Sequence, residues 1–257
     1  MSRSIFQRIA GKCRRLASTR LARRPWIMRN KTPLISFTFD DFPTSAFEVG
    51  GRILESHGYR GTYYTSAGLL GQSAPTGSII PGEQLPAVVA VGHELGCHTY
   101  AHCDAALTPA AEFERSIQEN RQVLKQLVPG ETLRSLSYPI GSPRPSIKRR
   151  SGRHYQGCRA GGQTHNAGKI DLNYLKAFFL EQAVSDPESI YAAIDRACEV
   201  NGWLIFATHD VAESPTRFGC TPRLFEEVVS AVAKSRARVL PVSKALEEIG
   251  IAPEQSQ

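Results

Sequence analysis

Residues 34–43 read LISFTFDDFP, and this short stretch sets the expectation for the whole fold. Its first six residues are rich in Ile, Phe and Thr, a composition that is typical of a buried strand. Two adjacent acidic residues, Asp40 and Asp41, follow at once. The stretch therefore predicts a strand whose carboxyl end carries two charged side chains.

Strand-like and helix-like patterns alternate on the carboxyl side of this stretch. Strands are expected at residues 34–39, 61–65, 93–97, 133–138, 175–180, 203–208 and 239–242, and helices at 45–57, 84–91, 109–127, 187–200 and 222–236. Regular alternation indicates an α/β fold with a parallel sheet and helices outside it. About seven such units favour a distorted (β/α) barrel of about seven parallel strands, with an open doubly wound sheet as the alternative. No G-x-G-x-x-G follows a strand, so no dinucleotide site is expected.

Positive charge is concentrated at the beginning of the chain. Residues 1–31 contain ten Lys/Arg and no acidic residue, whereas the whole chain has a formal net charge of +7. Subtracting these ten charges leaves −3 for residues 32–257. A nucleic-acid-binding domain normally carries its basic surface on the fold itself, so no nucleic-acid partner is expected. We expect a basic segment at 1–31, a folded domain at 32–250 and a C-terminal tail at 251–257.

Two interpretations of the basic segment stay open. Apolar residues interspersed among its charges would suit an amphipathic segment on an anionic membrane surface, and a solvated leader without fixed structure fits the same composition. Residues 1–31 lack the continuous apolar stretch that a secretory signal needs. The six cysteines form no C-x-x-C pair, which suits reduced thiols. The expected location is the cytoplasm, with peripheral membrane contact as an option.

Candidate site segments, three of them with side chains that can bind metal or transfer protons, follow four of the predicted strands. These are, in chain order, Asp40 and Asp41, His98 and His102, the segment 139–141, and His209 with Asp210. In a parallel barrel the carboxyl ends of the strands converge on one face. The sequence therefore predicts that these groups share one site.

The chemistry of this set is that of a metal-dependent hydrolase. Two imidazoles and one carboxylate are common protein ligands of a catalytic zinc, and the spacing His98-x-x-x-His102 lets both rings turn toward one ion. A second carboxylate can then act as a base and a separate histidine as an acid. Taken singly, a histidine pair is usually coincidental and an Asp-Asp pair is usually a turn or a helix cap. Their joint occurrence at strand ends favours one divalent ion, with zinc as the default and cobalt, nickel or iron as alternatives.

Four segments resemble the motifs of the NodB-type polysaccharide deacetylases, carbohydrate esterase family 4. Residues 38–43, TFDDFP, are similar to the family's T-F-D-D-G-P, and residues 92–102, GHELGCHTYAH, resemble G-H-E-x-G-x-H-[ST]-x-x-H almost throughout. Residues 137–141, SYPIG, resemble R-x-P-Y-G, and residues 208–210, THD, resemble the last motif. The four segments occur in the family's order across most of the chain.

This resemblance implies the NodB homology fold and assigns the main chemical roles. Asp41, His98 and His102 would hold the metal ion. Asp40 would be the base that deprotonates the attacking water, and His209 would be the acid that protonates the leaving amine.

The resemblance also implies the residues that would contact the substrate. The backbone N–H of Ile140 would stabilise the oxyanion, and Tyr138 and Pro139 would line the sugar site. Phe42 stands where the family has glycine, so its ring would either stack on a sugar or belong to the core. Ala207 stands where the family has leucine, which would alter the acetyl pocket.

Two supporting groups of the family's site are missing from their usual positions. Ser137 replaces an arginine that orients the base, and Arg159 or Arg144 could substitute for it from another loop; Arg159 could equally be a surface residue. No acidic partner of His209 is evident, and Asp171 is only a weak candidate. Asp210 is expected to fix local structure rather than to take part in catalysis.

The expected activity is removal of N-acetyl groups from N-acetylglucosamine-type units of a polysaccharide, an oligosaccharide or a lipid-linked sugar. The first alternative is a non-catalytic carbohydrate-binding relative, which the loss of the motif arginine at Ser137 keeps open. The second is a metal hydrolase that acts on another amide or on an O-acetyl ester.

Overall fold

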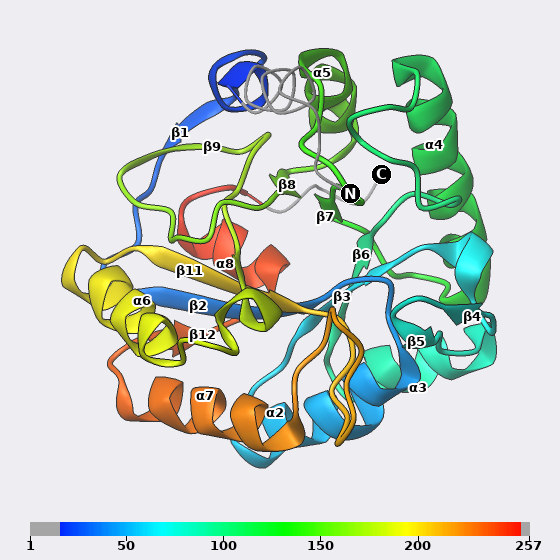
Figure 1. Cartoon of the computed structure of the whole chain (residues 1–257). Helices are drawn as coiled ribbons and strands as arrows, with labels where there is room; N and C mark the ends of the chain where they lie inside the picture. The colour runs from blue at the N-terminus through cyan, green and yellow to red at the C-terminus, as the bar shows by residue number, and fades with distance from the viewer. Residues whose placement is uncertain (1–15, 253–257) are drawn as a thin grey trace, which may run out of the picture.

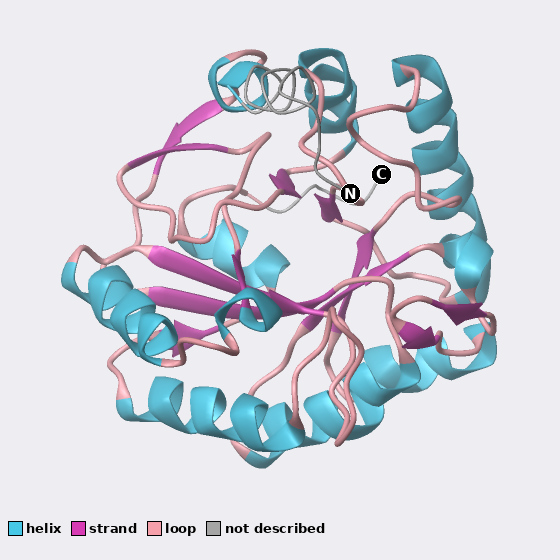
Figure 2. Cartoon of the chain, in the orientation of Figure 1, coloured by secondary structure: helices cyan, strands magenta, loops and turns pink. Residues whose placement is uncertain are grey.

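The computed structural model describes residues 16–252 and has a parallel, curled sheet at its centre. The strand order is β10-β11-β2-β3-β6-β7-β8, and every pairing in this sheet is parallel. The strands are β2 (Leu34–Phe39), β3 (Thr62–Thr65), β6 (Glu94–Cys97), β7 (Ser135–Ser137), β8 (Gly157–Arg159), β10 (Phe178–Phe179), β11 (Trp203–Thr208) and the short β12 (Arg238–Val239), which also pairs with β2. Figures 1 and 2 show these strands inside a ring of helices. The expectation of a distorted (β/α) barrel is confirmed.

The segment from residue 172 to residue 179 bridges the two ends of the strand order. On one side it bonds to β8, because the Cys158 N–H donates to the Leu172 carbonyl at 2.8 Å and the Ala160 N–H donates to the Leu175 carbonyl at 2.8 Å. On the other side it forms β10, which pairs with Phe206 and Ala207 of β11. Backbone pairing therefore continues around the barrel, and this segment becomes part of the wall beside the strand ends.

Helices connect successive strands and cover the outside of the sheet (Figure 1). They are α2 (Arg52–Ser56), α3 (Leu85–Ala90), α4 (Ala110–Leu127), α5 (Pro145–His154), α6 (Glu188–Glu199), α7 (Pro222–Lys234) and α8 (Val242–Glu248), with the single-turn elements η1 (Ala46–Gly51), η2 (Ala67–Leu69), η3 (Gly82–Gln84) and η4 (Leu180–Ala183). Helix α7 illustrates how the local sequence determines where a helix begins and which face it buries. The Thr221 hydroxyl accepts the Leu224 N–H, Pro222 occupies the first turn, and Phe225, Val228, Val229 and Val232 form its buried face.

Three local expectations need correction. The helix expected at 45–57 is present but contains the π-helix η1, after which α2 begins at Arg52. The strand expected at 239–242 ends at Val239, because Pro241 has no N–H for a sheet and instead precedes the first turn of α8. Strand β8 and helix α5 were not expected as elements. Three residues are too few to show a strand period, and the sequence of α5 is dominated by basic residues.

The described part of the basic segment packs on the barrel. Strand β1 (Pro25–Ile27) pairs antiparallel with β9 (Lys169–Asp171), and the Trp26 indole N–H donates to the Ile249 carbonyl at 2.9 Å. The fully buried Lys148 ammonium donates to the carbonyls of Ser18 at 2.7 Å and Leu21 at 2.9 Å. Residues 16–31 are thus held to α5 and β9.

The remaining expectations for the two ends of the chain lie outside the described residues. The expected membrane contact of residues 1–31 falls partly on residues 1–15, and the expected C-terminal tail falls mostly on 253–257. Within residues 16–252, none of the helices has both the length and the apolar character needed to cross a bilayer.

Candidate active site

The carboxyl ends of the parallel strands surround one large cavity of about 910 Å³. Its lining includes eight of the residues expected in the site: Asp40, Asp41, His98, His102, Tyr138, Ile140, Arg159 and His209. A second wall comes from the small hairpin of β4 (Ser73–Ala74) and β5 (Gly77–Ser78), which contributes Ser73 and Ala74. The folding of the barrel therefore brings together groups that are up to 169 residues apart in the sequence.

Asp41, His98 and His102 form a cluster that fits a metal ion. Their ligand atoms all lie within 4.8 Å of one another. Nε2 of His102 is 3.0 Å and Nε2 of His98 is 3.5 Å from Oδ1 of Asp41, and that oxygen is buried without a hydrogen bond among the described residues. Nδ1–H of His98 donates to the Ser137 carbonyl at 2.9 Å, which leaves Nε2 as a lone-pair donor. This donor set suits zinc or a similar divalent ion.

Burial and neighbouring charges shift the pKa of each of these three groups, and for Asp41 and His98 the shift favours the form that binds a metal ion. Burial lowers the pKa of His98 to about 4, so its imidazole is neutral at neutral pH. Burial alone would raise the pKa of Asp41, but the contact with His102 and the neighbouring histidines lower it well below its usual value. Burial opposes protonation of His102, and the Asp41 carboxylate outweighs it and raises the pKa.

Arg159 lies directly against Asp40. Its guanidinium bonds to both carboxylate oxygens of Asp40 and to the Ser137 hydroxyl, and the side chain of Arg159 is only 1% exposed. The rings of Tyr64 and Phe179 each lie 5.2 Å from the guanidinium carbon. Burial would raise the pKa of Asp40, and the Arg159 charge lowers it below its usual value. Asp40 is thereby held as an oriented carboxylate.

Arg144, the other candidate for this role, lies elsewhere. Its guanidinium bonds to the carbonyls of Leu107 and Thr108 and does not line the cavity. Ser137 and Arg159 are paired residues on the adjacent strands β7 and β8. An arginine on β8 therefore reaches Asp40 from the position directly opposite Ser137.

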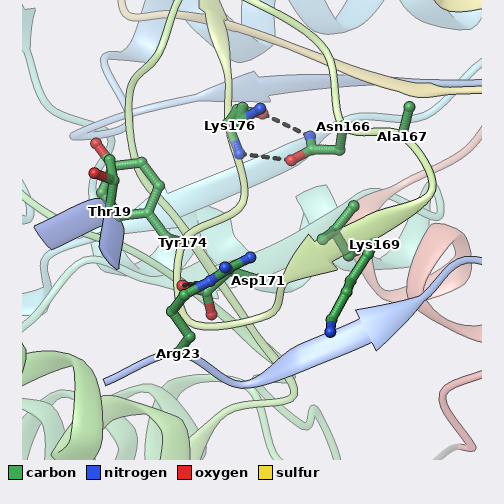
Figure 3. A pocket seen from close by; sticks show the side chains of 9 residues that line it. Thr19, Arg23, Asn166, Ala167, Lys169, Asp171, Tyr174 and Lys176 are labelled. Carbon is green, nitrogen blue, oxygen red and sulfur yellow. Dashed lines mark hydrogen bonds and ion pairs between the residues drawn. The ribbon is translucent and has the colours of Figure 1, made fainter. Parts of the chain in front are cut away.

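His209 has a main-chain partner rather than an acidic one. Its Nδ1–H donates to the Phe218 carbonyl at 3.1 Å. Asp171, the weak candidate, instead accepts the Lys148 ammonium at 2.8 Å and the Arg24 N–H at 2.8 Å. It lies beside Arg23 in a separate small pocket (Figure 3). Asp171 is thus a buried partner of the N-terminal segment, and the suggestion that it pairs with His209 is wrong.

Backbone strain is concentrated at the cavity. Eight non-glycine residues among those described have a left-handed conformation, and six of them belong to the loops that carry the site: Asp41, Phe42, Thr99, His102, Ile140 and Gln163. For Ile140, with φ of 62°, this conformation is costly because its side chain is β-branched. Such conformations persist where the surrounding structure enforces them, and they collect at functional sites.

The residues expected to contact substrate occupy different environments. Tyr138 and Ile140 line the cavity, and the Ile140 side chain is 72% exposed. Pro139 is in the same loop but is not part of the lining. The Phe42 ring is 0% exposed and stacks on Tyr63 with centroids 4.3 Å apart. Phe42 is therefore a core residue, and a sugar contact by its ring is not available in this conformation.

The cavity lining also includes residues that were not identified from the sequence, among them Gln163, Glu181, Arg217 and Phe218. Burial raises the pKa of Glu181 to about 8, with Asp40 and Asp210 contributing, which keeps this carboxyl protonated at neutral pH. Its position directly after the expected strand 175–180 was an available signal. Arg217 lies over the Phe218 ring, 4.5 Å from its centroid, in a loop without any recognisable motif.

The sequence matches the family model described as polysaccharide deacetylase over residues 28–155. The site built from strand ends and the fold agree with that match. The chain belongs to the polysaccharide deacetylase family, of the NodB type. No curated protein matches the sequence.

Solved structures share the fold at low sequence identity. The chitin deacetylase from the fungal pathogen Colletotrichum lindemuthianum is 19% identical, with a TM-score of 0.62 over 89% of this chain and 92% of that one. A family 4 acetyl xylan esterase from Clostridium thermocellum, in complex with a cobalt ion, is 16% identical, with a TM-score of 0.60 over 85% and 93%. A carbohydrate esterase family 4 pseudoenzyme from Bacillus anthracis is 12% identical, with a TM-score of 0.59 over 87% and 68%.

Proposed function

We propose that this protein is a metal-dependent deacetylase that removes N-acetyl groups from N-acetylglucosamine-type units of a glycan. One observation carries the proposal. The ligand atoms of Asp41, His98 and His102 converge beside Asp40, which Arg159 orients, and His209 lines the same cavity. This arrangement provides an ion site, a base and an acid around one reacting group.

The residues of this chain have distinct roles in the proposed reaction. Asp41, His98 and His102 would hold one divalent ion, which polarises the amide carbonyl and acidifies water. Asp40, ionised beside Arg159, accepts the proton of the attacking water. The N–H of Ile140 is the proposed donor to the developing oxyanion, a role that a preorganised backbone amide fills well. His209 presents Nε2 to the leaving amine because Nδ1 bonds to the Phe218 carbonyl.

The substrate class rests on the cavity and on the activities of relatives. A cavity of about 910 Å³ has room for a sugar ring together with its neighbours. The chitin deacetylase with the same fold is named for an N-acetylglucosamine polymer. We propose an oligosaccharide or polysaccharide of that kind, and a lipid-linked amino sugar is the other substrate that we include.

The test is acetate release from N-acetylglucosamine oligomers and lipid-linked sugars by chelated protein to which zinc, cobalt, nickel or iron is added. We expect release only with metal, and zinc is the ion that we expect to serve. The Asp40→Asn variant should still bind metal and should lose turnover. Acetate release that is unaffected by chelation would refute the proposal.

Two alternative functions are separated by the same assay. The acetyl xylan esterase with this fold makes an O-acetyl ester the main alternative substrate, and it predicts faster acetate release from O-acetylated xylan than from N-acetylated sugars. A non-catalytic sugar-binding protein predicts saturable binding and no release with any metal. The sequence favoured this non-catalytic alternative because serine, and not arginine, occupies position 137. In the structure Arg159 lies beside Asp40 instead.

We further propose that the protein works in the cytoplasm, with membrane contact as a property of its basic N-terminal segment. Residues 16–31 pack on the barrel, so a deletion should remove only residues 1–15. Weaker binding of the shortened protein to anionic liposomes, with unchanged acetate release, is the expected result. Equal binding by both proteins would refute membrane contact through this segment.

A further inference from the structure

The loop between β11 and α7 is organised by one buried carboxylate. Asp210 is 4% exposed, and its side chain accepts the Thr216 N–H at 2.7 Å and the Thr216 hydroxyl at 2.6 Å. The Asp210 carbonyl accepts the Cys220 N–H at 3.0 Å. Gly219 lies so close that a Cβ atom there would collide with the Asp210 side chain. Asp210 therefore restrains this loop at two points, through its carboxylate at Thr216 and through its main-chain carbonyl at Cys220.

Thr216 passes this restraint on to Phe218. Its hydroxyl donates to Asp210 and accepts the Phe218 N–H at 3.2 Å. The Phe218 carbonyl in turn accepts Nδ1–H of His209 at 3.1 Å, and the two rings lie 5.4 Å apart. A continuous chain of hydrogen bonds thus runs from Asp210 through Thr216 and Phe218 to the imidazole of His209.

A carbonyl partner has a definite consequence for the imidazole. A carbonyl oxygen can only accept, so Nδ1 must carry a proton, and Nε2 is left for the cavity. Among residues 16–252, no carboxylate bonds to His209. The orientation of the ring therefore depends on where the loop holds one backbone oxygen.

We propose that Asp210 and Thr216 are positioning residues, which fix the tautomer and orientation of His209 through the Phe218 carbonyl. The inference deepens the proposed function, because it assumes that His209 donates the proton to the leaving amine. The carboxylate that usually orients a catalytic histidine directly is replaced here by a carboxylate that acts through a loop.

The leaving group offers a way to test the proposal. An amine needs a proton in order to leave, whereas 4-nitrophenolate leaves without one. A defect confined to His209 should therefore slow hydrolysis of an N-acetylated sugar and spare 4-nitrophenyl acetate. For Asp210→Ala and Thr216→Val we expect kcat on the amide to fall about 100-fold with KM unchanged. This factor is the lower end of what general acid catalysis usually contributes. The rate on the ester should change by less than about 3-fold, because general acid catalysis contributes little there.

Matched variants separate positioning from a general loss of structure. Thr216→Ser retains the hydroxyl and should restore most of the amide rate. Glu213→Ala removes an exposed acid from the same loop and should behave as the unchanged protein. A parallel loss on both substrates, no loss on either, or equal effects of Thr216→Ser and Thr216→Val would overturn the proposal.

A second measurement does not depend on activity. Nitrogen-15 NMR of the histidine side chains should show His209 as the Nδ1–H tautomer in the unchanged protein and a mixture of tautomers in Thr216→Val. If the unchanged protein releases no acetate, the proposed function fails and this spectrum still decides the inference. An Nε2–H tautomer in the unchanged protein would overturn it.

Discussion

Replacing Arg159 with methionine isolates the group that orients the proposed base. Arg159 is 1% exposed and Asp40 is 4% exposed, so the variant leaves a carboxylate buried without its cation. Breaking a buried ion pair in this way costs about 3–5 kcal/mol. Burial, which raises the pKa of Asp40, would then be opposed only by the more weakly acting His98 and His209. We expect a large loss of stability and an acidic limb of kcat/KM that moves to higher pH.

The sign of the pH dependence makes this prediction specific. In the unchanged protein folding lowers the pKa of Asp40. The ion pair therefore contributes fully to the free energy of unfolding at pH values above the pKa of Asp40 in the unfolded chain, and this contribution is lost as the pH falls toward the lower folded pKa. Urea unfolding of chelated protein should show the cost of about 3–5 kcal/mol near pH 7.5, where the carboxylate is charged, and a smaller cost near pH 4.5.

Two comparison variants sharpen the result. Arg150→Met removes an arginine that is 37% exposed and paired with Glu114, and it should cost less than about 1 kcal/mol. The double variant Ser137→Arg/Arg159→Ser moves the guanidinium to the paired position on β7 and should restore part of the activity. If Arg159→Met matches Arg150→Met in stability and keeps the original pH profile, the orienting role of Arg159 is refuted.

Three other perturbations test separate parts of the structure. Asp41→Asn should lower zinc affinity at least tenfold, because an amide is a weaker donor than a carboxylate; calorimetric titration with zinc that gives an unchanged affinity would contradict the assigned ligand set. Glu181→Gln should raise the melting temperature of chelated protein at pH 9 and leave it nearly unchanged at pH 5. The folded pKa of about 8 lies above the ordinary glutamate value, so the stability of the unchanged protein declines as the pH rises from that ordinary value up to about 8. Phe42→Ala should cost about 3–5 kcal/mol in urea unfolding, through loss of the ring that stacks on Tyr63. Phe42→Gly should be about 1 kcal/mol more stable than Phe42→Ala, because a φ of 68° favours glycine; the reverse order would contradict the strain.

The parts of the fold that the sequence predicted are those with strong local signals. Strands β2 and β11 are six-residue runs that are buried at every position, and their predicted and observed limits coincide. Strand β8 has only Gly157, Cys158 and Arg159, and what makes it a strand is its pairing with β7. A three-residue segment is too short to show a strand pattern, so β8 could not be predicted from its own sequence. Its conformation is determined by tertiary pairing with β7.

In the site, too, the sequence reveals some groups and not others: side chains of a particular type can be recognised, whereas main-chain partners cannot. Asp41, His98 and His102 can be recognised in the sequence because metal ligation requires particular residue types at a particular spacing. Arg159 was one of two candidates beside Asp40, and only the register of β7 and β8 selects it. The partner of His209 is a backbone carbonyl, which every residue possesses, so no residue type marks it. Its position follows from loop contacts that form only in the folded chain.

The anchoring of the N-terminal segment also sets an order of events during synthesis. The carbonyl of Ser18 bonds to an ammonium that lies 130 residues later in the chain, on Lys148, which also needs Asp171 as its partner. At about 5–20 residues per second, the ribosome completes that partner on the order of 10 s after Ser18. Residues 16–31 must therefore wait until the middle of the chain has been made, and a nascent chain that stops before residue 171 lacks the residues on which this segment packs.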